Sequence, residues 1–188
     1  LSFSYTGSVY PTQKEALRLI PFFRLHDSRY AIYFHQVSEA EVESIRQEME
    51  QKERKAMELA NQTADIIFPG EQQPESDHGI RYEQAETGTN KDRHFRRAKG
   101  WFGYTLKTSK EASRLMITTR KNDPMKVVIL LNNEKLTAAP TISEADQEGF
   151  VTLCYPLPQK LGAGNYPIRF SPDGTEWTPA IYEIRLLE

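Results

Sequence analysis

The densest group of reactive side chains in this sequence lies between Gly70 and His78. These nine residues, GEQQPESDH, hold three carboxylates, two amides and one imidazole. Polar groups this concentrated must be solvated or must bond to one another, because a buried polar group without a partner costs about 1–3 kcal/mol. The sequence therefore predicts a polar loop that is the first candidate for a ligand-binding site. Its candidate residues are Glu71, Gln73, Glu75, Asp77 and His78.

The acidic residues of this loop suggest two chemistries. Two carboxyl groups about 5–9 Å apart can hydrolyse a glycosidic bond, and several carboxylates together can hold calcium, which takes six to eight oxygen ligands. Glu71, Glu75 and Asp77 are the candidates for both. Their spacing matches no EF-hand loop, and His78 and His94 do not form an H-x-x-x-H zinc pair. We therefore expect no cofactor and no metal, with calcium at the three acidic residues as the alternative.

A second polar segment, Thr87–Tyr104, is basic and ends in aromatic residues. Its Arg93, Arg96 and Arg97 could pair in bidentate fashion with the carboxylates of the polar loop. An internal network of this kind is the alternative to a ligand site. Asn90 is a further candidate ligand-binding residue. Nucleic-acid binding is not expected, because the basic run is short and the chain carries a net charge of -2.

The aromatic residues offer flat surfaces on which sugar rings can stack. On a strand, Trp101 and Gly103 would face one side, and Phe102 and Tyr104 the other. One of these sides is expected to pack in a core or an interface. Trp177 follows a predicted turn and is the better candidate for an exposed aromatic side chain. Trp101, Tyr104 and Trp177 complete the set of candidate ligand-binding residues.

The elements that must position these residues begin with three β-like segments, Leu1–Tyr5, Ala16–Leu25 and Arg29–His35, which form a partial sheet. A helix over residues 39–61 follows. Ser38 and Glu41 form a capping box at its start, and apolar residues recur behind them at helical spacing. The middle of this helix is charged, so we expect a surface helix that links two β regions.

From Gly100 onward the chain shows short strands separated by Gly, Pro, Asn and Asp residues, a pattern typical of an antiparallel sandwich or barrel. A tight turn is predicted at Asn132–Asn133. Cys154, the only cysteine, lies in a strand and is expected to be buried and unreactive. The predicted strands are Trp101–Leu106, Arg114–Thr119, Lys126–Leu131, Phe150–Tyr155, Tyr166–Phe170 and Ile181–Leu187.

The predicted fold is mainly β: an antiparallel, jelly-roll-like β-sandwich preceded by a partial β-sheet and one long linking α-helix. The expected parts are residues 1–37, the end of a middle β domain; 38–64, the linking helix; and 65–188, the C-terminal β-sandwich. No apolar run approaches the roughly 20 residues of a membrane span, so no membrane association is expected. The start shows no signal peptide and no initiator Met, which suggests a fragment or a processed chain.

Several separated motifs resemble the C-terminal region of bacterial glycoside hydrolase family 127, the β-L-arabinofuranosidase-like proteins. They are PFFRLHDSRY at 21–30, the polar segment at 70–78, TGTN at 87–90 and GY at 103–104, and FSYTGSVY at 3–10 is also similar. Their order and spacing resemble that region across nearly the whole chain. One motif departs from the family, which commonly has roughly DEFWRD where this chain has DRHFRR at 92–97.

The resemblance implies a non-catalytic role. The family's catalytic glutamate and cysteine residues lie around a zinc ion in an upstream α/α-barrel domain, so no catalytic residue carries over. The chain would be an accessory region that stabilises, or orients substrate for, a carbohydrate-degrading enzyme. The implied partners are the upstream catalytic domain of the same protein and a plant-type oligosaccharide, in the periplasm or outside the cell. The alternatives are a free-standing carbohydrate-binding module and a structural calcium-binding domain.

Overall fold

The computed structural model describes residues 2–4, 16–18 and 38–188, and the chain divides into two compact units between Glu50 and Gln51. In the first unit, β1 (Ser2–Ser4) and β2 (Ala16–Arg18) form an antiparallel pair. Strands were predicted at both places. The remainder of the predicted strand at 16–25 and the predicted strand at 29–35 lie outside the described residues.

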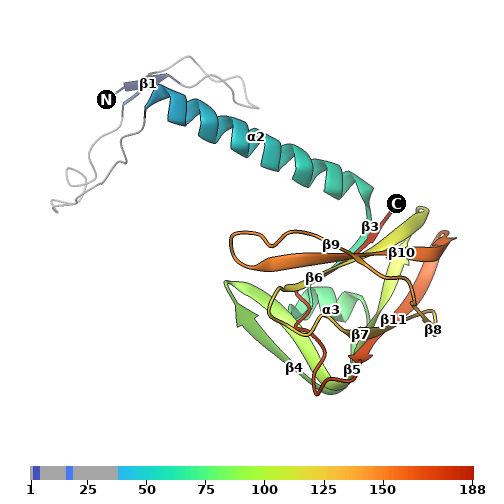
Figure 1. Cartoon of the computed structure of the whole chain (residues 1–188). Helices are drawn as coiled ribbons and strands as arrows, with labels where there is room; N and C mark the ends of the chain where they lie inside the picture. Colours follow the sequence, from blue (N-terminus) through green and yellow to red (C-terminus); the bar gives the residue numbers. More distant parts are fainter. Residues whose placement is uncertain (1, 5–15, 19–37) are drawn as a thin grey trace. The chain divides into compact units, whose positions relative to one another are not determined.

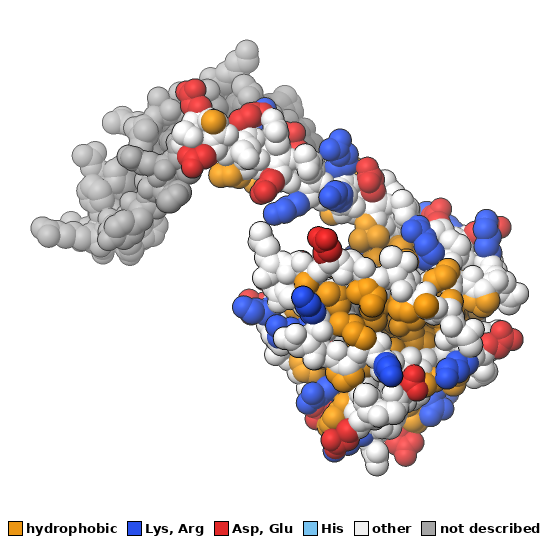
Figure 2. Space-filling model, in the orientation of Figure 1, with side chains coloured by type: hydrophobic (Ala, Val, Ile, Leu, Met, Phe, Trp, Pro, Cys, Tyr) orange, Lys and Arg blue, Asp and Glu red, His pale blue; other side chains and the backbone are white. Residues whose placement is uncertain are grey.

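Helix α2 (Glu39–Gln62) confirms the predicted long helix to within one residue (Figure 1). Its capping box is formed: the Ser38 N–H donates to Glu41 Oε2 at 2.7 Å, and the Glu41 N–H donates to Ser38 Oγ at 3.3 Å. No side chain of α2 is buried, and Figure 2 shows charged side chains of both signs along it. No helix in the described part of the chain has the length and apolar character needed to cross a membrane.

The second unit is a β-sandwich of two five-stranded sheets, in which all paired strands run antiparallel. This confirms the predicted fold class. The first sheet has the order β3 (Thr63–Ile67), β12 (Glu183–Leu187), β6 (Ala112–Arg120), β10 (Phe150–Leu161) and β9 (Thr141–Ile142). The second has the order β4 (Arg81–Asn90), β5 (Arg93–Thr108), β11 (Gly164–Pro172), β7 (Val127–Leu131) and β8 (Glu134–Lys135).

The core lies between the two sheets because apolar residues alternate along the long strands. On β5, Phe102, Tyr104 and Leu106 face inward, and the ring of Phe102 stacks on Phe170 of β11 with 5.2 Å between centroids. The first sheet contributes apolar side chains from three adjacent strands. They are Leu115, Ile117, Leu153, Tyr155, Ile184 and Leu186.

Three local predictions were wrong. The polar segment is not a loop throughout, because Gln72–Asp77 form a short helix, α3. The region before Gly100 is also β: β4 was not predicted, and β5 begins at Arg93. The two are joined at Lys91 and Asp92, whose φ values of 51° and 60° fit a two-residue hairpin turn. Cys154 is half-buried rather than buried.

The turn predicted at Asn132–Asn133 is confirmed. Both residues have positive φ, 52° and 66°, and they connect β7 to β8. Asparagine tolerates this left-handed backbone better than most residues, which is why the pair is a hairpin signal. The turn places Asn133 at the end of the second sheet, where it borders the pocket described below.

Truncating one inward ring tests this arrangement. Phe102→Ala removes a fully buried ring and should lower the free energy of unfolding by about 3–5 kcal/mol. The matched control is Tyr82→Ala, because Tyr82 pairs with Phe102 in the register but is 57% exposed. The Tyr82 ring contacts the Arg96 guanidinium, so Tyr82→Ala should lower the free energy of unfolding by only about 1 kcal/mol. Urea denaturation compares the two variants, and equal losses would contradict the placement of the core.

Candidate functional site

The polar segment is organised by a buried ion pair between Glu75 of α3 and Arg96 of β5. Arg96 donates from Nε to Glu75 Oε1 at 2.6 Å and from its second nitrogen to Oε2 at 2.7 Å. Tyr104 donates its hydroxyl to Oε1 at 2.7 Å, and the Gly70 N–H donates to the same oxygen at 2.9 Å. The predicted internal network therefore exists, with Arg96 as its cation and Glu75 as its carboxylate.

This network holds Glu75 in its charged form. Burial raises the pKa of the Glu75 carboxyl, but the hydrogen bonds from Arg96, Gly70 and Tyr104 outweigh it, and the pKa lies below its ordinary value. Burial and the neighbouring Glu75 carboxylate raise the pKa of Tyr104 well above its ordinary value. Glu75 is thus a fixed anion whose oxygens are already bonded, so it has no proton to give as a general acid.

Gly70 is required by this geometry. Its φ of +89° lies in the left-handed region, and a Cβ there would come within 2.8 Å of the Phe95 carbonyl oxygen. The backbone of β5 therefore passes directly against Gly70. This close approach brings the Gly70 N–H to Glu75.

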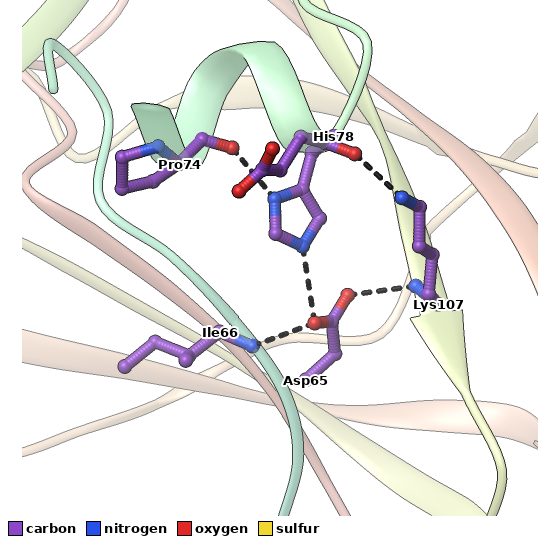
Figure 3. Close-up of polar contacts among 6 residues, drawn as sticks. Asp65, Ile66, Pro74, His78 and Lys107 are labelled. Carbon is purple, nitrogen blue, oxygen red and sulfur yellow. Dashed lines mark hydrogen bonds and ion pairs between the residues drawn. The ribbon is translucent and has the colours of Figure 1, made fainter. Parts of the chain in front are cut away.

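A second network surrounds His78, just after α3 (Figure 3). Its Nδ1 lies 2.7 Å from the Pro74 carbonyl oxygen and its Nε2 lies 3.1 Å from Asp65 Oδ1. The other oxygen of Asp65 accepts the Lys107 N–H at 2.7 Å, and Lys107 Nζ donates to the Asp77 carbonyl at 2.5 Å. Strand β3, helix α3 and strand β5 are thereby joined at one point.

The two partners of His78 favour its protonated form. A carbonyl and a carboxylate both accept hydrogen bonds, so each ring nitrogen must carry a proton to satisfy them. The hydrogen bond to Asp65 raises the pKa of His78 above its ordinary value, against the opposing effect of burial. The side chains of His78 and Asp65 are only 12% and 13% exposed, so water screens this ion pair weakly.

An open pocket of about 280 Å³ lies on the outer face of the second sheet. Trp101, Gly103, Tyr104 and Thr105 line it from β5. Along this strand Trp101, Gly103 and Thr105 alternate with Phe102 and Tyr104, whose side chains are buried in the core. Of the predicted ligand-binding residues, Trp101 and Tyr104 therefore border the pocket. The prediction that Trp101 and Gly103 share one side of a strand is thus confirmed. Residues from the other strands and turns complete the lining: Gly79, Arg81, Leu130, Asn133, Pro167, Ile168 and Arg169.

The wall at Trp101 is held in place by two contacts. The indole Nε1 donates to Glu83 Oε2 at 3.1 Å, and the guanidinium carbon of Arg169 lies 4.1 Å from the ring centroid. A cation stacked on an aromatic face gains about 0.5–2 kcal/mol. Trp101 and Arg169 therefore form one preorganised unit beside the pocket.

The register explains why the pocket is open. Gly103 pairs with Arg81 of β4 on one side and with Arg169 of β11 on the other. Gly103 has no side chain, and a Cβ there would clash with the Ile168 carbonyl oxygen of the adjacent strand. Gly103 is itself buried, and its backbone forms part of the floor of the pocket between the two arginines.

Trp177 lies outside this pocket and is half-buried rather than exposed as predicted. The guanidinium carbon of Arg97 is 4.6 Å and Lys99 Nζ is 5.0 Å from its ring centroid. Arg97 also pairs with Glu86, and Lys99 pairs with Glu176. Cations that already have partners thus occupy the surroundings of Trp177.

The other candidate residues are dispersed. Glu71 is exposed at the start of α3, Gln73 donates to Asp77 at 2.8 Å on the surface of that helix, and Asn90 ends β4. Glu71, Glu75 and Asp77 do not converge on a common point. Within the described part of the chain, no three His, Cys, Asp or Glu side chains are placed to share a metal ion.

Sequence reasoning missed the two arginines, Thr105 and Asn133. The alternation of side chains along β5 could have placed Thr105 on the same face as Trp101 and Gly103, because the three residues are two positions apart. Arg81, Asn133 and Arg169 come from other elements, and only the strand register brings them to β5.

Neutralising the buried carboxylate should be strongly destabilising. Glu75→Gln leaves the Arg96 guanidinium buried without a counter-charge, and removal of one partner from a buried pair typically lowers the free energy of unfolding by about 3–5 kcal/mol. Glu86→Gln is the matched control, since it breaks the exposed pair with Arg97 and should lose less than about 1 kcal/mol. Denaturant unfolding of both variants measures the difference. A loss below about 1 kcal/mol in Glu75→Gln would contradict the bracing role.

The His78 network should make stability depend on pH. Because its pKa is raised in the folded state, the folded chain holds the proton more tightly than the unfolded chain. The stabilisation is full below about pH 6.5, the ordinary value, and is lost as the pH rises through the raised pKa. The difference in unfolding free energy between the wild type and His78→Gln should therefore shrink from pH 6 to pH 9. Curves that stay parallel over this range would show that His78 binds no extra proton on folding.

Comparison with solved structures finds several carbohydrate-binding modules. A family 35 carbohydrate-binding module from an environmental isolate is 12% identical with a TM-score of 0.49, covering 65% of this chain and 92% of that one. A family 35 module from Clostridium thermocellum is 13% identical with a TM-score of 0.46, covering 65% and 98%. A Cellvibrio mixtus module in complex with cellotriose is 13% identical with a TM-score of 0.40, covering 67% and 98%. Values this low say nothing about what this chain binds.

No curated protein is similar enough in sequence to count as a relative. Two family models match the chain. A domain of unknown function, DUF4986, matches residues 1–36. A family of unknown function, DUF6805, matches residues 58–187, which include the whole sandwich from β3 to β12. The chain therefore belongs to the DUF6805 family.

Proposed function

We propose that the β-sandwich is a non-catalytic domain that binds a carbohydrate in the pocket at Trp101. The observation that carries this proposal is the convergence of an aromatic ring with several hydrogen-bonding side chains around an open floor at Gly103. A sugar ring presents apolar C–H groups and a rim of hydroxyls. A pocket that combines an aromatic wall with a few placed polar groups suits both parts of such a ligand.

The polar groups are of the kinds that sugar hydroxyls need. Thr105 offers a hydroxyl and Asn133 an amide, and each of these groups can both donate and accept hydrogen bonds. Arg81 and Arg169 offer donors only. The pocket is open to solvent and about 280 Å³ in volume, close to the lower end of the usual range for small-ligand sites. We therefore infer a site for one or two sugar units of a longer chain.

The lining of this pocket supports binding rather than hydrolysis. Glycoside hydrolysis ordinarily needs two carboxyl groups that flank the scissile bond, and no aspartate or glutamate lines the pocket. Glu83, next to Trp101, accepts the indole N–H. Glu75, the most buried of the predicted carboxylates, is locked in the ion pair with Arg96.

The wider context of this proposal follows from the resemblance to glycoside hydrolase family 127. In this context the chain is an accessory region that serves a carbohydrate-degrading enzyme, and its partner is an upstream catalytic domain of the same protein. The expected ligand is an oligosaccharide of plant type, met in the periplasm or outside the cell. The match of a second family model at residues 1–36 supports a chain built from more than one domain.

Calorimetric titration of the chain with a panel of plant cell-wall oligosaccharides tests the binding proposal. We expect at least one member to bind, and Trp101→Ala to weaken that binding at least tenfold. The matched control is Trp177→Ala, since Trp177 lies outside the pocket, and its affinity should stay within about twofold. Thermal melts confirm that both variants fold. Absence of binding to every glycan, or equal losses in the two variants, would overturn the proposal.

A further inference from the structure

The pocket at Trp101 has an unusual charge for this protein. Two arginines line it, Arg81 and Arg169, and no carboxylate does, although the chain as a whole carries a net charge of -2. In the described part of the chain neither arginine forms an ion pair. Many other surface cations of the sandwich do: Arg97 with Glu86, Lys99 with Glu176, Lys110 with Glu188, and Lys160 with Glu111.

Arg81 and Arg169 both line this pocket. Arg81 and Arg169 both pair with Gly103, from opposite sides, so two strand spacings, or about 9–10 Å, separate their backbones. Their side chains leave the same face of the sheet as the missing side chain of Gly103. Nothing on β5 fills the gap, because a Cβ at Gly103 would clash with the Ile168 carbonyl oxygen.

We infer that this pocket binds an acidic sugar, a uronate whose carboxylate lies between the guanidinium groups of Arg81 and Arg169; the inference rests on the carbohydrate binding proposed above. Guanidinium groups match the planar carboxylate with two parallel N–H···O bonds. A neutral sugar has no negative charge to pair with either guanidinium group. A uronate satisfies them and leaves its ring hydroxyls for the polar side chains nearby.

The stacking of Arg169 on Trp101 adds to this selectivity. The guanidinium carbon is 4.1 Å from the ring centroid, and the ring itself is fixed by its bond to Glu83. A side chain held in this way loses less rotamer entropy when a ligand binds. Arg81 is exposed and has no such contact with an aromatic ring in the described residues. Arg169 therefore presents a fixed charge, and Arg81 can adjust to the ligand.

Paired oligosaccharides that differ only in the carboxylate test this inference. Oligogalacturonates and their carboxyl-reduced, neutral counterparts of equal length are titrated into the full chain at 50 mM and 300 mM NaCl. The titrations use the Trp177→Phe variant. Trp101 is then the single tryptophan of the chain, so tryptophan fluorescence reports on the pocket. We expect the acidic form to bind at least tenfold more tightly at 50 mM NaCl, and this advantage to shrink at 300 mM because salt screens exposed charges.

Variants of the two arginines test whether these residues cause the preference for the acidic sugar. Arg81→Gln and Arg169→Gln should each reduce the preference for the acidic form at least fivefold, and Arg169→Lys should restore only part of it because lysine cannot form the bidentate fork. Lys126→Gln, an exposed cation outside the pocket, is the control and should leave the preference unchanged. Equal affinity for both forms would overturn the acidic-sugar inference and leave carbohydrate binding standing. No binding of any glycan would overturn both.

Discussion

The buried ion pair between Glu75 and Arg96 holds helix α3 against strand β5, the longest strand of the sandwich. It joins α3 to β5 with two short hydrogen bonds, and Tyr104 and Gly70 satisfy the carboxylate further. The main chain of Arg96 also exchanges hydrogen bonds with Ile181, which leads into β12 of the other sheet. A buried ion pair offsets the cost of desolvation only when all its polar groups are hydrogen-bonded. Among the described residues, every buried side-chain polar atom has a hydrogen-bond partner. Arg96 therefore takes part both in the buried ion pair and in a backbone bridge to the segment that leads into the other sheet.

The helix α3 depends on this pair and on the His78 network, since six residues are too few to form a stable helix alone. Pro74 is tolerated because it lies in the first turn, where backbone N–H groups have no partner within the helix. One network anchors the middle of the helix to β5, and the other anchors its end to β3 and β5. Glu75 and His78, two of the candidate residues near Gly70, therefore serve structure, and the open pocket lies on the opposite face of β5.

The sequence predicted those features whose physical cause is local. The capping box, the helical spacing behind it and the asparagine turn each lie within a few residues, and the structure shows all three. Strand β4 was missed because it lies at the edge of a sheet and is exposed on both faces, so it lacks apolar alternation. The pocket was missed for another reason. Arg81, Gly103 and Arg169 are far apart in sequence, and only the hydrogen-bond register, which tertiary packing decides, makes them neighbours.

Strand β5 carries two independent sets of residues. The side chains of Arg96, Ala98, Phe102, Tyr104 and Leu106 are buried in the ion pair or in the core, whereas Trp101, Gly103 and Thr105 border the pocket. Because alternate side chains leave opposite faces of a strand, substitutions at Trp101 and Thr105 can change the lining of the pocket with little effect on the core. Gly103 is the exception, since its neighbour on β11 excludes a side chain. The pocket-facing residues of this strand can therefore vary while the opposite face stays constant.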